Sequence, residues 1–253
     1  MNVRLKTEKD LQILRESGKI LASVLGILKE AAKEGVKLSH LDELARRLVS
    51  EAGAKPAFLG YAEKGRKPFP AAICASVNEV IVHGVPSDYV LKKGDVLKID
   101  FGVNYKGYIT DSAFTVGIPP ISDEAKRLIN ATEQSLYEAI NVMRPGGHLG
   151  DIGAAVEGAV KKAGFQVIKN LTGHGVGFEI HEDPSIYNFG NPGEGIELKK
   201  GMVLAVEPMV AVSSSRVVMQ EDGSFVTEDG SQSAHFEHTI AITDDGPEIL
   251  TVL

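Results

Sequence analysis

The stretch VLKIDFGVNYKGYITDSAFTV, residues 96–116, decides the fold class. Its β-branched and aromatic residues flank an NYKG turn, a pattern typical of two antiparallel strands joined as a hairpin. With Tyr105 and Lys106 as a two-residue loop, the predicted register places Asp100 directly opposite Asp111. Opposed side chains lie about 5 Å apart, where two carboxylates repel each other unless something neutralises them. Either a cation binds there, or the aspartates face water at strand ends, or the register is shifted by one residue.

A related stretch occurs in the second half of the chain. LKKGDVLKIDFGV at 91–103 matches LKKGMVLAVEPMV at 198–210, and Asp100 then corresponds to Glu207. A chance match is the alternative, but acidic residues inside otherwise apolar strands fall at the same place in both copies. The spacing is too long for a solenoid repeat. We therefore predict one domain, residues 1–253, whose halves of about 1–116 and 117–253 are related by a pseudo-twofold axis.

Hydrophobic periodicity predicts an α+β protein in which helices cover the outer face of an antiparallel sheet. In the second predicted helix, Ser39 is the candidate N-cap and Gly53 the candidate stop. Helices are expected at Glu8–Lys33, 38–53, about Asp123–Met143 and about Asp151–Ala163, and strands at Ala71–Gly84, Val96–Val116 and from Gln166 to the end.

Charge and composition exclude several classes of protein. The net charge is -7, and no run of Lys and Arg is long enough to predict nucleic acid as a substrate. The apolar run Ile20–Leu28 is far shorter than the roughly 20 residues of a membrane span. The first residues lack the apolar core of a secretory signal, so we expect a cytoplasmic protein. A single cysteine, Cys74, cannot form an intrachain disulfide.

Further ligand-type side chains lie in the second half. His174 and His181 flank a glycine-rich stretch, and Glu207 and Glu237 lie in or at the end of apolar strands. A buried carboxylate requires a metal, an Arg or a proton, and neither strand supplies a nearby Arg. With the two aspartates and one imidazole, these carboxylates suit Mn²⁺, Fe²⁺, Co²⁺ or Zn²⁺. Four negative charges are too many for one divalent ion and favour two. A pair of such ions can activate a water molecule for hydrolysis, which predicts a hydrolase.

Six ordered motifs, SVNEVIVHGVP, KIDFGV, ITDSAFT, GHGVGFEIHEDP, VEPM and FEHTIAIT, closely resemble those of the type 1 methionine aminopeptidases. The resemblance covers nearly the whole chain. It implies the pita-bread fold in a single catalytic domain. It also implies that the protein removes the N-terminal methionine from peptides and nascent chains, favouring a small second residue.

The resemblance also implies residue roles. Asp100, Asp111, His174, Glu207 and Glu237 would hold two divalent ions, with Asp111 and Glu237 bridging them. A hydroxide would attack the first peptide carbonyl while Glu207 relays the proton. By the same resemblance, His83 and His181 would be catalytic residues that contact the substrate without binding metal.

The methionine pocket is less like that of the family. Matching positions nominate Tyr61, Phe69 and Cys74 as lining residues, with Ile180 where a phenylalanine is expected. The chain has no tryptophan, and Phe225 lies in the loop where some relatives carry one. The segment between Tyr61 and Phe69 is also longer than is usual in the family.

Other histidines have weaker predictions. His238 should point away from Glu237 and be structural. His235 shares the face of Glu237 because strand side chains alternate, which predicts a place beside the metal ligands.

Two alternatives remain at this point: a proline-directed aminopeptidase of the same fold, and a binding protein of this fold without metals. The first usually carries an extra N-terminal domain, for which the chain has no room. We expect a monomer, and any contact with the ribosome would use its folded surface.

Overall fold

The computed structural model describes residues 2–62 and 67–252. Its helices are α1 (Glu8–Ala31), α2 (Leu38–Glu51), α3 (Asp123–Val142) and α4 (Leu149–Lys162), which confirms the four predicted helices. Thr7 caps α1 through a capping box with Asp10. The predicted N-cap of α2 is wrong, because Ser39 lies inside the helix and Lys37 is the capping position. Ser39 instead donates its hydroxyl hydrogen to Asp88.

Every strand pair among the described residues is antiparallel, as predicted. Hydrogen bonding divides the strands into four small sheets rather than one, with the orders β1-β4-β2 (β5 pairing with β4), β13-β10-β6, β11-β12-β3 and β15-β14-β9-β7-β8. The strands are β1 (Lys55–Pro56), β2 (Ile73–Val77), β3 (Val80–Val82), β4 (Val96–Tyr105), β5 (Tyr108–Gly117), β6 (Gln166–Val167), β7 (Thr172–Gly175), β8 (Glu182–Tyr187), β9 (Val203–Val206), β10 (Met209–Ala211), β11 (Val217–Met219), β12 (Phe225–Thr227), β13 (Ser233–His235), β14 (His238–Thr243) and β15 (Gly246–Ile249).

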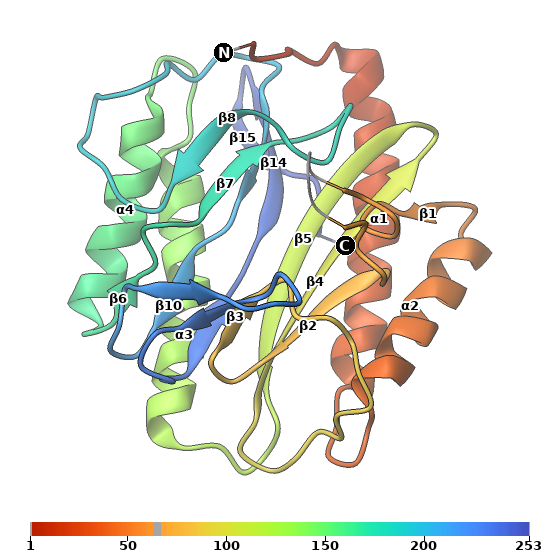
Figure 1. Cartoon of the computed structure of the whole chain (residues 1–253). Coiled ribbons are helices and arrows are strands. Elements are labelled where there is room, and N and C mark those ends of the chain that lie inside the picture. Colours follow the sequence, from red (N-terminus) through yellow and green to blue (C-terminus); the bar gives the residue numbers. More distant parts are fainter. Residues whose placement is uncertain (1, 63–66, 253) are drawn as a thin grey trace.

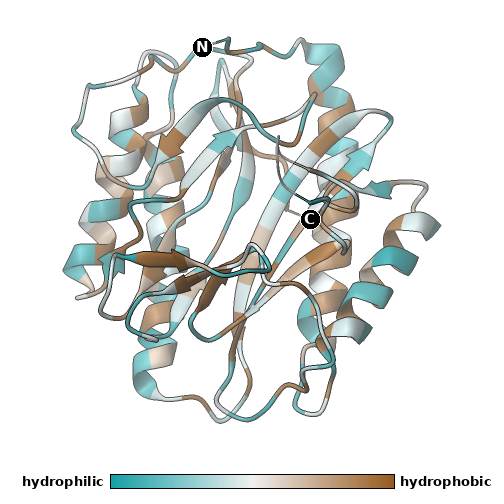
Figure 2. Ribbon diagram, in the orientation of Figure 1, coloured by the Kyte–Doolittle hydropathy of each residue, from teal (hydrophilic) through white to brown (hydrophobic). Residues whose placement is uncertain are grey.

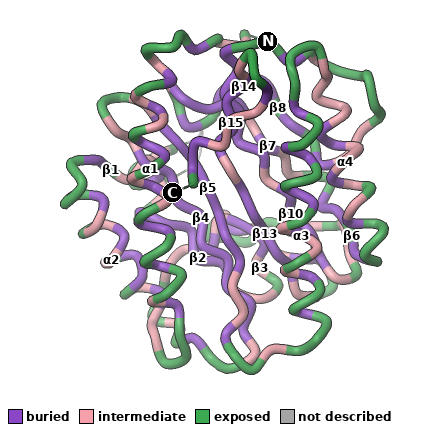
Figure 3. The backbone as a smooth tube through the Cα atoms, turned by 180° about the vertical axis from the view of Figure 1, so that it is seen from behind, coloured by how far each residue is buried: buried purple, intermediate pink, exposed green. Residues whose placement is uncertain are grey.

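The helices lie behind the sheets in the view of Figure 1, with α1 and α2 on one side and α3 and α4 on the other. Hydrophilic and hydrophobic residues are interleaved along the helices (Figure 2), as expected where one face packs and the other meets solvent. One cluster of buried apolar side chains includes Leu28, Leu41, Leu136 and Val156, one from each helix. The central strands β4, β5 and β14 are largely buried beneath this layer (Figure 3). None of the described helices is long and apolar enough to span a membrane.

The related stretches of the two halves differ in the continuity of their strands. β4 runs unbroken through Asp100, whereas β9 ends just before Glu207 and β10 begins just after Pro208. Proline has no N–H to donate, so it interrupts a hydrogen-bonded ladder. Glu207 therefore lies in a gap between two sheets.

Candidate metal centre

The β4–β5 hairpin turns one residue later than predicted. Lys106 and Gly107 form the loop, with φ values of 53° and 87°, and Tyr105 pairs with Tyr108. A two-residue type I′ loop needs positive φ at both central positions, which glycine adopts without strain. The conformation of Gly107 thus fixes the register.

In this register the two hairpin aspartates are not directly opposed. Asp111 pairs with Gly102, and Asp100 pairs with Ala113, so the predicted pairing of the aspartates is wrong. The offset is even, however, and side chains alternate between faces, so both carboxylates still project from the same face as diagonal neighbours.

Asp111 and Glu237, from opposite halves of the chain, lie on segments that hydrogen bond to each other. Ala113 and Glu237 form an isolated antiparallel bridge. The backbone N–H of Asp111 donates to the hydroxyl of Thr239, which in turn donates to the Asp111 carbonyl, at 2.9 and 2.7 Å. The backbone thus holds these two carboxylates in a fixed relation.

His174 and Glu207 approach from the neighbouring strands. His174 lies on β7 and pairs with Ala205 of β9, and the Asn188 amide donates to the Glu207 carbonyl at 2.9 Å. A Cβ on Gly173 would lie 2.4 Å from the Ala205 carbonyl oxygen and 3.4 Å from the Glu207 side chain. Only glycine therefore permits β7 to run this close to the backbone of β9.

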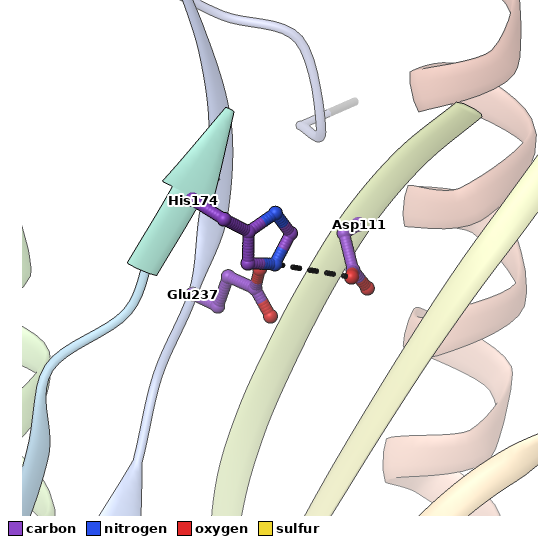
Figure 4. A group of neighbouring side chains, drawn as sticks. All are labelled: Asp111, His174 and Glu237. Carbon is purple, nitrogen blue, oxygen red and sulfur yellow. Dashed lines mark ion pairs between the residues drawn. The ribbon is translucent and has the colours of Figure 1, made fainter. Parts of the chain in front are cut away.

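The side chains of Asp111, His174 and Glu237 converge from three strand segments (Figure 4), and their ligand atoms lie within 4.8 Å of one another. His174 Nε2 is 3.9 Å from Asp111 Oδ2 and 3.5 Å from Glu207 Oε1. The fold therefore brings ligand-type atoms of both halves to one point.

Within residues 2–62 and 67–252, the buried side-chain atoms without a hydrogen-bond partner are all in this region. They are Asp100 Oδ1, Asp111 Oδ1, Glu237 Oε1 and both ring nitrogens of His235. Buried polar groups are normally hydrogen bonded, so a group of unpartnered oxygens on one side of a cavity is what a cation site requires.

The electrostatics agree with this interpretation. The pKa values of Asp100 and Glu237 are raised far above their ordinary range, mainly by burial and secondly by repulsion from the neighbouring carboxylates. Burial also raises the pKa of Glu207 and Asp111. The pKa of His174 is lowered to about 3 by burial and by the nearby His181. The imidazole is thus neutral, which is the form that binds a metal, and divalent ions would offset the carboxylate charges.

The other two predicted site histidines flank the same region. The Tyr61 hydroxyl hydrogen bonds to His181 Nδ1 at 2.8 Å, and the ring centroid of His181 lies 4.5 Å from that of His174. His83 has a φ of 61°, which is unusual for a residue other than glycine. Its ring meets that of Phe225 edge-on at 5.7 Å, and Phe225 is the first residue of β12 and not part of a loop.

These residues open onto a cavity of about 860 Å³, lined by Tyr61, Phe69, Cys74, His83, His181 and all five nominated ligand residues. Burial and the nearby aspartates raise the pKa of the Cys74 thiol, so it stays protonated as part of an apolar wall. Part of the segment between Tyr61 and Phe69, residues 63–66, lies outside the described residues.

Ile180 is placed differently from the other pocket residues. It does not line the cavity within the described part of the chain, but packs in one apolar cluster with Phe58 and Cys74. A Cβ on Gly102 would lie 2.8 Å from Phe58 and 3.2 Å from Ile180. Phe58 does line the cavity; the sequence analysis missed it because a lone phenylalanine after a short strand has no distinguishing pattern.

A buried ion pair near His181 was also missed. Lys6 Nζ lies 2.7 Å from Glu182 Oε2, with both side chains almost fully buried. The other Glu182 oxygen accepts the backbone N–H groups of Phe178 and Glu179. The N-terminal segment thus holds the turn that carries His181, through a contact between residues 176 positions apart.

Comparison with known proteins agrees with this geometry. The model of metallopeptidase family M24 matches residues 12–244. The chain is 44% identical to a methionine aminopeptidase of Clostridium perfringens over 250 residues, covering 98% of each chain. It also superposes on the crystal structure of the Thermotoga maritima methionine aminopeptidase with a TM-score of 0.95 and 41% identity, covering both chains fully. The predicted pita-bread fold is thereby confirmed.

A prolidase from Pyrococcus furiosus is less similar, with a TM-score of 0.79 and 23% identity, and the match covers 98% of this chain but 65% of the prolidase. That likeness concerns the fold alone, so the proline-directed alternative is not favoured. The chain belongs to metallopeptidase family M24, and within it to the methionine aminopeptidases.

Proposed function

We propose that this chain is a metalloaminopeptidase that removes the N-terminal methionine from peptides and nascent proteins. The observation that carries the proposal is the convergence of four carboxylates and a neutral imidazole in the lining of one cavity. The full-length similarity to methionine aminopeptidases supports the same activity.

Asp100, Asp111, His174, Glu207 and Glu237 would hold two divalent ions, Co²⁺, Mn²⁺, Fe²⁺ or Zn²⁺, with Asp111 and Glu237 shared between them. The unpartnered oxygens of Asp100, Asp111 and Glu237 fit this role. When bound, such a pair of ions lowers the pKa of a water molecule and polarises a peptide carbonyl.

The remaining steps belong to side chains of the cavity. Glu207 takes the proton of the attacking water and delivers it to the leaving amine, as a general base and then a general acid. The Tyr61 hydroxyl and His181 Nδ1 form a hydrogen bond of 2.8 Å. We assign the hydroxyl as its donor, which would place the ring hydrogen on Nε2, on the side of the substrate. His181 and His83 then stabilise the negative charge that develops on the carbonyl oxygen.

We propose that the same cavity provides the selectivity for methionine. Tyr61, Phe69 and Cys74 would accept the unbranched methionine side chain, and Phe58 and Ile180 support that wall. We propose that the second residue of the substrate must be small, because the cleft between the two halves leaves little room there. A methylene in an apolar pocket changes selectivity by only about 1 to 3 kcal/mol, so slow cleavage after leucine is expected.

We propose that residues 1–253 act as one catalytic domain and as a monomer, in the cytoplasm where nascent chains emerge. Any contact with the ribosome would be made by the folded surface. Neither nucleic acid nor a membrane is needed for the activity.

The test is methionine release from Met-Gly-Phe by metal-stripped protein, with and without Mn²⁺ or Co²⁺. Leu-Gly-Phe and Met-Leu-Phe are the controls for the first and second residues. We expect release that returns with metal, prefers methionine and is faster before glycine. Absence of release in every condition would favour the metal-free binding protein. Equal release from Met-Gly-Phe and Leu-Gly-Phe would retain the hydrolysis but contradict the selectivity.

A further inference from the structure

His235 is a buried histidine beside the metal centre for which the proposed function has no use. It is 1% exposed, and both ring nitrogens lack a hydrogen-bond partner among the described residues. The proposed ions would explain the unpartnered oxygens of Asp100, Asp111 and Glu237, but not the nitrogens of His235.

The backbone of His235 is held firmly. It is the last residue of β13, and it pairs with Met209 of β10. The Thr115 hydroxyl donates to the His235 carbonyl at 2.6 Å and accepts its N–H at 2.9 Å. The ring therefore projects from a position fixed by strands of both halves.

The ring is directed at Glu207. His235 Nε2 lies 3.5 Å from Glu207 Oε2, while the other oxygen, Oε1, lies 3.5 Å from His174 Nε2. The two oxygens of this carboxylate thus have different neighbours: one faces the ligand group and the other faces His235. A separation of 3.5 Å is at the outer limit of a hydrogen bond, so a shift of a few tenths of an ångström completes the contact.

We propose that His235 is a positioning residue that donates its Nε2 hydrogen to Glu207 Oε2 and so directs Oε1 into the metal centre. This inference rests on the proposed function, because it assigns His235 a role toward a ligand of the proposed ions. Such outer contacts orient metal ligands and account for about 10- to 100-fold in metal affinity.

His238 offers a matched contrast. It lies three residues further on, at the start of β14, and its Nδ1 hydrogen bonds to the Thr251 hydroxyl at 2.8 Å. Its imidazole is therefore explained by a local contact away from the ligands. Substitution of His238 controls for the loss of a largely buried histidine in the same part of the fold.

The test compares His235→Gln, which keeps an N–H donor at similar reach, with His235→Met, which has a similar length and no donor. Mn²⁺ affinity is measured by calorimetry, and the melting temperature of each metal-free variant is recorded. We expect about 10- to 100-fold weaker Mn²⁺ binding for His235→Met. His235→Gln and His238→Met should stay within about threefold of the unsubstituted chain, since one retains the donor and the other lies away from the ligands.

Equal Mn²⁺ affinity of His235→Met and the unsubstituted chain would overturn the inference, as would equal losses in the Met and Gln variants. Should His235→Met not fold, ¹⁵N NMR of the unsubstituted protein decides the matter, because the inference requires the ring hydrogen on Nε2 and not on Nδ1. An unsubstituted chain that binds no Mn²⁺ contradicts the proposed function instead. The NMR measurement on that protein then still tests the role of His235.

Discussion

The two halves of the molecule are built on related stretches but contribute differently to the centre. In the first half, Asp100 and Asp111 project from one continuous hairpin whose register is set by Gly107. In the second half, Pro208 interrupts the equivalent strand, and Glu207 lies in the gap between β9 and β10. Side chains on a regular strand point to one face or the other. Glu207 lies outside a regular strand, and one of its carboxylate oxygens lies near His174 while the other lies near His235.

The halves also differ in their imidazoles. His174, His181 and His235 belong to the second half and His83 to the first. The first half therefore supplies mainly fixed negative charge. The second half adds neutral rings on segments held by longer-range contacts, such as the pair of Lys6 with Glu182. Both halves therefore contribute ligand residues and cavity residues, but most of the imidazoles at the centre come from the second half.

The largest expected effect is that of Asp111→Asn. If the hairpin holds the ions, loss of this shared carboxylate should reduce both metal content and activity, and by more than the about 10- to 100-fold of an outer residue. Metal analysis of the purified variant, with methionine release from Met-Gly-Phe, checks this. A variant that retains two ions per chain would remove Asp111 from the bridging position.

His181→Ala should separate the two roles. Because His181 contacts substrate rather than metal in this account, the variant should retain its metal content but lose about 10²- to 10⁴-fold in kcat. The exposed His40→Ala is the control and should behave as the unsubstituted chain. An unchanged kcat in His181→Ala would show that the second half does not act on the substrate through this ring.

Lys6→Met should destabilise the second half through Glu182. Removing one partner of a buried ion pair costs up to about 3 to 5 kcal/mol of unfolding free energy, and Arg4, which lies 3.2 Å from Glu182, offsets part of that cost. Lys200→Met is the matched control, since Lys200 and Asp244 form an exposed pair and such pairs contribute little. Urea unfolding of both variants measures the difference, and equal midpoints would contradict a structural role for the N-terminal segment.

Metal binding should release protons, a smaller effect that involves both halves. Burial raises the pKa of Asp100, Asp111, Glu207 and Glu237, so in the metal-free protein these groups hold protons to a higher pH than ordinary carboxyl groups. His174 has a pKa of about 3, so its ring is neutral at pH 6 and has no extra proton to release.

Metal competes with these protons, so its affinity should rise with pH, by about tenfold per unit for each proton released. Calorimetry at pH 6 in buffers of different ionisation enthalpy counts the protons. Binding heats that do not depend on the buffer would contradict the raised pKa values.

The four helices and the antiparallel strands could be predicted from the sequence, because the spacing of apolar residues indicates which face of each element is buried. It did not give the register of the hairpin, since the NYKG turn allows two loop positions and only the backbone conformation distinguishes them. The shared face of Asp100 and Asp111 survived this error because the shift was even.

Contacts between distant segments were beyond the sequence. Lys6 and Glu182 carry no local pattern that links them. Nor does any pattern predict that Ile180 packs with Phe58 beside Gly102 and not in the lining of the cavity, as the described residues show. His235 was placed on the face of Glu237 by alternation alone. The contact of His235 with Glu207 could not be predicted in this way, because Glu207 lies between β9 and β10 and outside the regular alternation of either strand.

The central claim is that the two halves together build one centre for two ions. The most direct measurement is anomalous diffraction from crystals soaked in Mn²⁺. We expect two peaks about 3.5 to 4 Å apart, between the carboxylates of the hairpin and those of Glu207 and Glu237, with His174 bound to one of them. A single peak, or two peaks bound by residues of only one half, would contradict the account.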